Sequence, residues 1–499
     1  MTSTATPDPR RWWILGALSV ALLVIGVDNT ILNVAIPTIE RDLGATTGQM
    51  QWIVDSYMLV FAGLLLTMGS LGDRFGRRRA LFTGLVLFGA SSTIAAVSDS
   101  AAMLIAARAS MGIGGALIMP ATLSILMNVF PRSEHAKAIG IWAGVFGLGV
   151  AIGPTGGGFL LEHFSWGSVF LVNLPIVAAA LAIGAKLIPE SRDPSTPPLD
   201  LPGAALSTFG LGSLVYGLIQ APSDGWASPS TLVAFGVALV LLAGFVAREL
   251  TAEHPMLDVR LFRLPAFSAA SGALALTSFA LFGSIFFLTQ HMQGVLGYTP
   301  LEAGIRLLPI AGGMIVAAPL SAVVSARFGR RLTVAAGMTG VALGLAAMAL
   351  ADAGNGYGPV ALSMVLLSSG MGLSMAPATE SVMSVLPLEK AGVGSAMNDT
   401  VRMVGGALGV AVLGSVLSTG YRAGMDDAPE AARESLSGAL ASGDHDLANT
   451  AIDAFVSGMH TTAIVAAAVA LSGAILAATF LPRRESRATA VAVPEPAAA

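Results

Sequence analysis

Long apolar runs follow one another along most of the chain and are separated by short polar segments. Each run is about 20 residues long, which is the length that a helix needs to cross the hydrocarbon core of a bilayer. Backbone amides in lipid must be hydrogen-bonded within their own segment, so each run is predicted to be a helix. The pattern predicts fourteen spanning helices, over 12–34, 50–71, 80–98, 101–128, 137–161, 167–188, 202–220, 229–248, 267–292, 303–325, 332–351, 358–386, 392–418 and 456–481.

Two polar segments do not fit this pattern. Residues 419–455 are long and acidic, and we expect a partly helical extracellular loop there. Residues 482–499 are rich in alanine, proline and charge, which predicts a disordered cytoplasmic tail.

The placement of lysine and arginine predicts how the chain is oriented, because cytoplasmic loops carry an excess of these residues. With the N-terminus inside, 20 of the 26 basic residues fall on the inner side and three on the outer side, and three lie within spans. Both termini are therefore predicted to face the cytoplasm.

A repeat divides the chain into related halves. The segment GSLGDRFGRRRA at 69–80 returns in degenerate form as SAVVSARFGRRLT at 321–333, and IMPATLSILMNVFP at 118–131 returns as MAPATESVMSVLP at 375–387. Parallel repeats of this kind are typical of transporters whose binding site lies between the halves. We expect a six-helix bundle over 1–190, a two-helix insert over 191–260 and a second six-helix bundle over 261–481.

Composition supports an all-α integral membrane protein. Of the 499 residues, 54% are hydrophobic and 11% are charged, whereas soluble domains carry about 25% charged residues. The chain has no cysteine, no HExxH motif and no phosphate-binding loop, so we expect no catalytic residue, no metal and no cofactor. Scattered arginines do not form a patch for nucleic acid. A membrane enzyme, an ATP-driven pump and a sensor are the disfavoured alternatives.

The motifs resemble those of the major facilitator superfamily, and within it the fourteen-helix drug:proton antiporters of the EmrB/QacA type. DNTILNVAIP at 28–37 is similar to their first-helix signature, GSLGDRFGRRR at 69–79 to the loop between helices two and three, and RASMGIGGA at 108–116 to the fourth-helix arginine motif. The fifth helix carries the pattern associated with antiporters, formed by Gly144, Gly153, Pro154, Gly157 and Gly158. Its segment GPTGGG at 153–158 is expected to form a tightly sealed contact between the halves, and the alternative is that the glycines only let helices pack closely. The resemblance covers about 10–481. It implies proton-coupled export of several drugs by alternating access, in the cytoplasmic membrane of a bacterium.

The first repeat is a candidate gate. Asp73 is expected near the start of the thirteenth span, around Gly392, where a carboxylate is favoured by about 0.3–1 kcal/mol. The alternative is that the arginines only fix the topology. Ala326 replaces the aspartate in the second repeat, so the contact is expected on one side only. The motif comprises Gly69, Gly72, Asp73, Arg74, Gly76, Arg77 and Arg78.

Charged residues inside spans are costly, and they are functional candidates for that reason. The candidates for proton coupling and cargo binding are Asp28, Asp55, Arg108, Glu380, Asp399 and Arg402. The first three are expected at similar depth in the outer half of the first bundle, and the others in the inner half of the second. Asp28 ranks first as the proton carrier, then Asp55, then Asp399 and Glu380. Simple pairing of Asp399 with Arg402, three residues apart on one helix, is an equal alternative.

The expected mechanism is competition. A carboxylate in a low-dielectric cleft can hold a proton or a cargo molecule, and holding both is disfavoured. Acids exceed arginines within the spans by one, which favours small lipophilic cargo that is cationic or zwitterionic. Aromatic residues such as Trp142 and Phe146 either line an adaptable pocket or pack in the core. We expect a monomer in contact with protons, cargo and membrane lipid. The alternative function is export of one endogenous metabolite or antibiotic.

Overall fold

The computed structural model describes residues 8–43, 47–192, 200–253, 255, 257, 259–352, 354–386, 390–426, 428–429, 432–433 and 436–482. Within these residues every regular element is a helix, as predicted. The tail over 483–499 lies outside the described residues.

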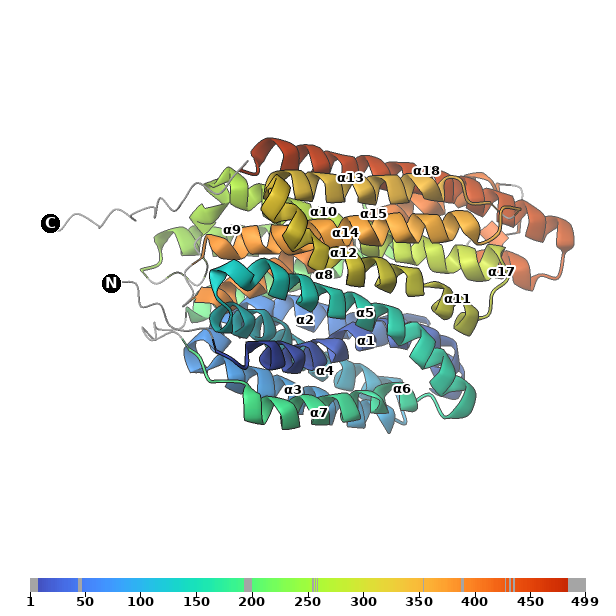
Figure 1. Ribbon diagram of the computed structural model, residues 1–499. Coiled ribbons are helices and arrows are strands. Elements are labelled where there is room, and N and C mark those ends of the chain that lie inside the picture. Colours follow the sequence, from blue (N-terminus) through green and yellow to red (C-terminus); the bar gives the residue numbers. More distant parts are fainter. Residues whose placement is uncertain are drawn as a thin grey trace, which may run out of the picture.

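Fourteen segments are long and apolar enough to cross a membrane, which agrees with the sequence prediction. The helices lie side by side along one common direction, and α1 begins at the same end of the bundle at which α18 ends (Figure 1). We call this end the terminal face and the opposite end the far face. The elements are α1 (Arg11–Leu43), α2 (Thr47–Phe75), α3 (Arg77–Ala96), α4 (Ala101–Val129), η1 (Arg132–Glu134), α5 (His135–His163), α6 (Ser168–Leu171), α7 (Asn173–Leu187), α8 (Leu201–Asp224), α9 (Pro229–Thr251), η2 (Val259–Arg263), α10 (Pro265–Gln290), η3 (His291–Val295), α11 (Pro300–Arg306), α12 (Leu308–Phe328), α13 (Arg330–Met348), α14 (Gly358–Ser384), α15 (Ala391–Ala423), α17 (Leu436–Ala441) and α18 (His445–Phe480).

Three details differ from the sequence prediction. The sixth span is interrupted between α6 and α7, and the tenth between α11 and α12. The loop expected over 419–455 is shorter, because α15 continues to Ala423 and α18 already begins at His445. Asp444 caps α18 by accepting hydrogen bonds from the backbone of Asp446 and Leu447, so helical structure continues beyond the apolar part of the sequence.

The helix pairing repeats in the two halves. In the first half α1 packs on α5 and α4 packs on both α2 and α3. In the second half the equivalent pairs form, with α10 on α15 and α14 on both α12 and α13. Two seams join the halves, α2 with α15 and α5 with α12, and the repeat relates one seam to the other.

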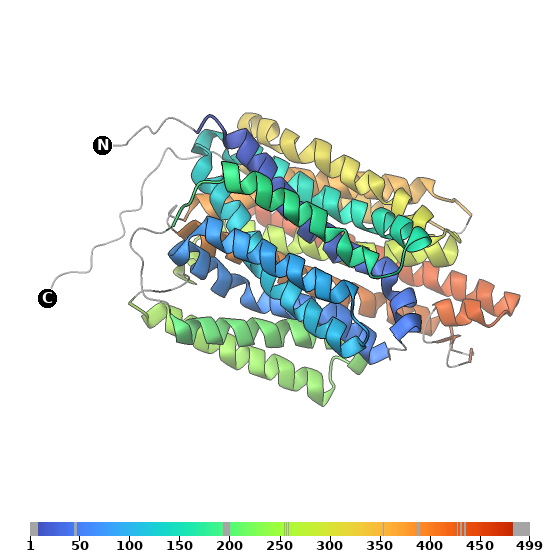
Figure 2. The same cartoon turned by 90° about the horizontal axis from the view of Figure 1, so that it is seen from below.

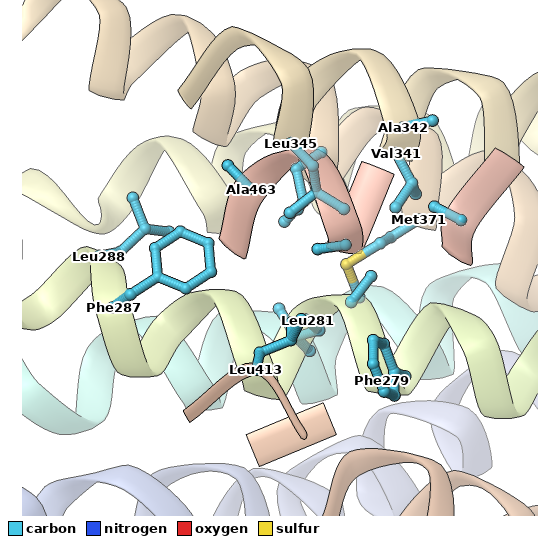
Figure 3. Close-up of a cluster of buried hydrophobic side chains, with 14 of the residues drawn as sticks. Phe279, Leu281, Phe287, Leu288, Val341, Ala342, Leu345, Met371, Leu413 and Ala463 are labelled. Carbon is cyan, nitrogen blue, oxygen red and sulfur yellow. The ribbon is translucent and has the colours of Figure 1, made fainter. Parts of the chain in front are cut away.

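Each half has its own apolar core. One buried cluster is built almost entirely from α1 to α7, and the other from α10 to α18. Part of the second cluster is drawn in Figure 3, where Phe279, Leu281 and Met371 converge from α10 and α14. Because the two cores are largely separate, each half can move as a body, and the contacts along the seams decide their relative position.

The insert lies at the side of the bundle. Figure 2 shows α8 and α9 (pale green) along its flank. Helix α8 touches both halves, because it packs on α2 and on α15. The hydroxyl groups of Thr67 and Thr208 lie 3.0 Å apart and join α8 to α2, and the Trp226 indole donates to Ser415 Oγ on α15 at 2.9 Å. The insert therefore spans the α2–α15 seam from outside.

Candidate functional site

Asp28 and Arg108 form a buried ion pair inside the first half. Arg108 Nη1 donates to Asp28 Oδ2 at 2.7 Å, and both side chains are almost fully buried. Asn173 Nδ2 donates to the other oxygen, Oδ1, at 3.2 Å. Arg108 also donates through Nε to the Ile53 carbonyl at 3.2 Å, and its guanidinium lies 4.4 Å from the centre of the Tyr57 ring. Both oxygens of Asp28 thus have protein partners.

Asp55 lies where α2 meets the insert. It lines a narrow crevice between α2 and α8, together with Trp52, Leu59, Tyr216 and Gln220. The rings of Trp52 and Tyr216 stack there with their centres 6.0 Å apart. Asp55 therefore faces the insert, a side of α2 that apolar periodicity does not reveal.

Asp399 and Arg402 lie on one turn of α15, in the half of the bundle nearer the terminal face. The charged atoms Arg402 Nη1 and Asp399 Oδ1 are 3.7 Å apart, which is an ion-pair distance without a hydrogen bond. Asn398 Nδ2 donates to the same Oδ1 at 3.2 Å. The Arg402 guanidinium lies 5.1 Å from the centre of the Phe146 ring, so this turn faces α5 of the other half.

This turn of α15 concentrates buried polar atoms that lack hydrogen bonds. Among the described residues, Asp399 Oδ2, Arg402 Nε and Thr400 Oγ1 have no hydrogen-bond partner, and neither have Asn398 Oδ1 and Ser395 Oγ. Buried polar groups in native proteins are almost always satisfied, so a cluster of this kind is where a proton, a water molecule or a polar group of a ligand would bind. The contrast with Asp28, whose two oxygens are both engaged, is clear.

Glu380 is part of an ion pair at the terminal face. Arg330 Nη2 donates to Glu380 Oε1 at 2.8 Å, and Arg330 Nη1 lies 3.5 Å from Ser384 Oγ. Arg330 belongs to the second repeat and stands 253 positions after Arg77. Pairing is therefore the main feature of Glu380, and its partner comes from a neighbouring helix of the same half.

The gate motif closes the α2–α15 seam at the terminal face. Asp73 Oδ1 and Oδ2 accept hydrogen bonds from the backbone N–H groups of Gly392 at 2.9 Å and Val393 at 3.0 Å. These are free N–H groups in the first turn of α15, where a carboxylate is favoured. Arg77 Nε and Nη2 donate to the same carboxylate at 2.8 and 2.7 Å. The contact expected from the sequence is present, and it links the two halves.

Other residues of the motif hold this contact in place. Gly69 brings α2 against α15, because a Cβ there would lie 2.6 Å from the Gly392 carbonyl oxygen. Gly76 makes the turn into α3 with a φ of 115°, which favours glycine. Its N–H donates to the Gly72 carbonyl at 3.0 Å. The motif thus combines a carboxylate cap with a tight turn.

The remaining arginines of the motif lie around this turn. Arg78 donates from its backbone to Glu190 Oε1 and from its side chain to the Ala185 carbonyl, which ties the turn to the end of α7. Arg74 lies 5.4 Å from the centre of the Phe75 ring. The second seam has no carboxylate in the equivalent position, because the exposed Ala326 stands there.

Asp73→Asn is expected to slow transport while the protein still inserts in the membrane. The amide loses the charge that Arg77 and the α15 N–H groups stabilise, and hydrogen bonds to charged groups contribute about 1.5–3 kcal/mol. The natural chain has no cysteine, so a single Ser395→Cys change behind the contact reports its opening. Maleimide labelling at this position should become faster in Asp73→Asn. Transport and labelling at unchanged rates would contradict a gating role for Asp73.

The fifth-helix glycines divide between two faces of α5. A Cβ at Gly158 would lie 3.2 Å from Leu301, and Gly144 lies opposite Ile315, so these two glycines face the second half. Gly304 of α11 closely approaches the backbone at Pro154. Gly153 and Gly157 instead pack on α1 within the first half. The expected seal between the halves thus involves only part of the motif.

Gly153→Ala should destabilise the first half by about 1–3 kcal/mol, the usual cost of overpacking. The added methyl would lie 2.8 Å from the Val27 carbonyl oxygen and would also collide with Thr30. Gly156→Ala on the same helix is the matched control, because nothing lies within 4 Å of a Cβ there. Thermal unfolding of both variants in detergent provides the measurement. Equal stability of the two variants would contradict the close packing.

Sequence reasoning missed two neighbours of the candidate residues. Asn173, the second partner of Asp28, is a lone amide in an apolar run, where the sixth span is interrupted. Arg330 was not expected to pair with Glu380. An isolated polar residue inside a span is a signal that could have identified Asn173, whereas the Arg330 pair depends on packing between helices.

The comparisons with known proteins agree with this architecture. The model of the Major Facilitator Superfamily matches residues 18–410, which is most of the chain. The human organic anion transporter MFSD10 (TETRAN) has a similar fold, with a TM-score of 0.63 at 15% identity over 94% of this chain and 100% of that one. The chain belongs to the Major Facilitator Superfamily.

Curated relatives show which members of the superfamily this chain is similar to. The chain is 38% identical to the multidrug efflux pump LfrA of Mycolicibacterium smegmatis, over 95% of this chain and 97% of the relative. It is 36% identical to the tetracenomycin C resistance and export protein of Streptomyces glaucescens, over 94% and 91% of the two chains. The methyl viologen resistance protein SmvA of Salmonella typhimurium is 34% identical, over 83% and 84%. These relatives are efflux, export and resistance proteins.

Proposed function

We propose that this protein exports small lipophilic compounds in exchange for protons, and that it works as a single chain in a bacterial cytoplasmic membrane. Both termini would face the cytoplasm, as the distribution of lysine and arginine predicts. Two relatives that are named as efflux and export proteins match nearly the whole length of this chain, which supports the export function. The terminal face is then the cytoplasmic gate, and the far face is the outer one.

The observation that carries the proposal is the turn of α15 around Asp399. Its carboxylate is buried at the contact between the halves, and one of its oxygens has no hydrogen-bond partner among the described residues. A carboxylate oxygen without a hydrogen bond is costly in such a place. A proton would remove that cost, and so would a cationic group of the cargo. The single oxygen cannot bind both well at the same time. Competition at Asp399 would couple proton entry to cargo release.

This assignment changes the ranking expected from the sequence. Asp28 is engaged by Arg108 and Asn173, so we propose that it positions the first half and supports the site indirectly. Glu380 is engaged by Arg330, which favours a supporting role as well. Asp55 faces the insert. Asp399 then becomes the first candidate for the coupling carboxyl, with Arg402 as the neighbouring charge.

Alternate opening of the two seams would give access to the site from one face at a time. When Asp73 releases α15, the α2–α15 seam can part at the terminal face, and cargo can reach Asp399 from the cytoplasm. When that contact forms again, the access must come from the far face, where α5 meets α11 at Gly158 and Leu301. Inward movement of one proton supplies about 2.3 kcal/mol per 100 mV of membrane potential.

Purified protein in liposomes tests the proposal. An imposed acidic exterior should drive outward transport of a lipophilic dye or of methyl viologen, and an uncoupler should stop it. Proton uptake should rise when cargo is added. Outward transport that ignores both the pH gradient and the voltage would refute proton exchange.

A second candidate function is export of one specific compound. The similarity to the tetracenomycin C resistance and export protein supports it. The two candidates differ in range, so expression in a pump-deficient bacterium with a panel of dyes, quaternary ammonium compounds and antibiotics separates them. Protection against chemically unrelated members of the panel favours multidrug export, and protection against one class favours the dedicated exporter.

A further inference from the structure

A cavity lies between the insert and the two halves, and one end of it reaches the Asp399 turn at Thr400. Its volume is about 420 Å³, within the range of sites that hold small molecules. The walls come from α2, α8, α9, α15 and the linker that contains η2. They are formed mainly by apolar side chains, among them Leu66, Leu211, Leu242, Phe245, Leu257 and Met397.

The position of this insert cavity matches one leaflet of a bilayer. One end of the cavity lies at the terminal face, at η2 between the end of α9 and the start of α10. Its inner end reaches Thr400, nine residues after α15 begins at Ala391. At 1.5 Å per residue this is a depth of about 14 Å. The hydrocarbon core is about 30 Å thick, so one leaflet contributes about half of that.

Among the described residues that line the cavity, the positively charged ones lie at its end near η2. Arg260 and Arg263 line it there, and both are exposed. Arg260 uses Nη2 to donate to the Leu250 carbonyl at 3.1 Å, which fixes its position at the entrance. Phe262 and Leu264 on the same segment are also exposed, as is typical of a segment at the membrane interface. Among the described residues that line the cavity, none carries a carboxylate.

A second apolar hollow adjoins the first. It has a volume of about 730 Å³, lies on the lipid-facing side of α8 and α9, and shares Leu242, Val246 and Leu250 with the insert cavity. Side chains of α9 thus line both hollows, and the two arginines lie at the end of the insert cavity near η2. This arrangement fits a molecule with two apolar chains and one anionic head.

We propose that the insert cavity binds an anionic glycerophospholipid from the leaflet at the terminal face. One acyl chain fills the cavity, the other lies in the hollow on α9, and the phosphate contacts Arg260 and Arg263. Basic pockets between membrane helices on the cytoplasmic side bind anionic lipid heads in the same way. The bound lipid would brace the insert against α15, next to the turn that carries Asp399.

Native mass spectrometry of the full-length, delipidated protein tests the proposal. The probes are dioleoyl phosphatidylglycerol and dioleoyl phosphatidylcholine, which differ in head-group charge but share their chains. The wild type should bind the first phosphatidylglycerol more tightly than phosphatidylcholine. In Arg260→Gln/Arg263→Gln that preference should fall by about tenfold or more, since each basic side chain near an anionic head contributes to binding. Arg10→Gln/Arg192→Gln is the matched control, because both residues are exposed and neither lines the cavity.

A cavity-filling change provides an independent arm. Leu242→Trp should weaken binding of both lipids to a similar extent, because it blocks the chains and leaves the arginines intact. Phosphatidylglycerol should also raise the unfolding temperature of the wild type and of the control, but not that of the arginine variant. An unchanged preference in Arg260→Gln/Arg263→Gln would overturn the proposal. So would displacement of phosphatidylglycerol by a transported dye, which would identify the cavity as an entrance for cargo.

Discussion

Asp399→Asn is expected to abolish proton-driven export while the protein remains folded and inserted. The amide has nearly the shape of the carboxyl, and the 3.7 Å pair with Arg402 has no hydrogen bond to lose, so the packing of α15 is kept. The hydrogen bond from Asn398 can still form after the amide turns. The side chain can no longer take up or release a proton. In liposomes, cargo efflux driven by an acidic exterior should fall to the rate of protein-free vesicles, and the proton uptake caused by cargo should disappear.

Two further measurements separate coupling from damage. Cargo binding to Asp399→Asn should persist for neutral compounds and weaken for cationic ones, because the negative charge is lost. Asp446→Asn, an exposed acid in the first turn of α18, is the matched control and should transport normally. If Asp399→Asn kept the wild-type exchange of protons and cargo, the coupling carboxyl would have to lie elsewhere, with Asp55 as the next candidate.

The membrane spans were predictable because lipid thickness and backbone hydrogen bonding determine their number and length. All fourteen predicted spans are present in the structure. Some helices, such as α18, are longer than the apolar sequence because they include polar turns at their ends. The contact of Asp73 with Gly392 was also predictable, since a free helix start is a specific partner for a carboxylate. Both predictions depend on local physical rules.

The neighbours of each charge were less predictable. A membrane helix is apolar on all sides, so hydrophobic periodicity does not reveal which face meets another helix and which meets lipid. For this reason the sequence, which predicts a similar depth for Asp55, Asp28 and Arg108, does not reveal that Asp55 faces the insert. For the same reason Gly153 was assigned to the seam, although it packs on α1. The partners of buried charges follow from tertiary packing.

Asp28→Asn is expected to destabilise the protein by about 3–5 kcal/mol, the usual effect of removing one partner of a buried ion pair. Arg108 would remain almost fully buried, in contact with the Ile53 carbonyl, the Met111 sulfur and the Tyr57 ring. The variant should unfold at a lower temperature in detergent and should export poorly. Reduced export alone would therefore not identify Asp28 as the proton carrier.

The double variant Asp28→Asn/Arg108→Gln distinguishes the two roles. Removing both charges eliminates the unpaired guanidinium, and replacement of a whole buried pair is often close to neutral in stability. Asn173 can still donate to the amide oxygen at position 28. If Asp28 positions the first half, stability and proton-driven export should recover together, most of the way to the wild type. If the double variant is stable but exports without any response to the pH gradient, Asp28 carries the proton, and Asp399 would then serve the cargo.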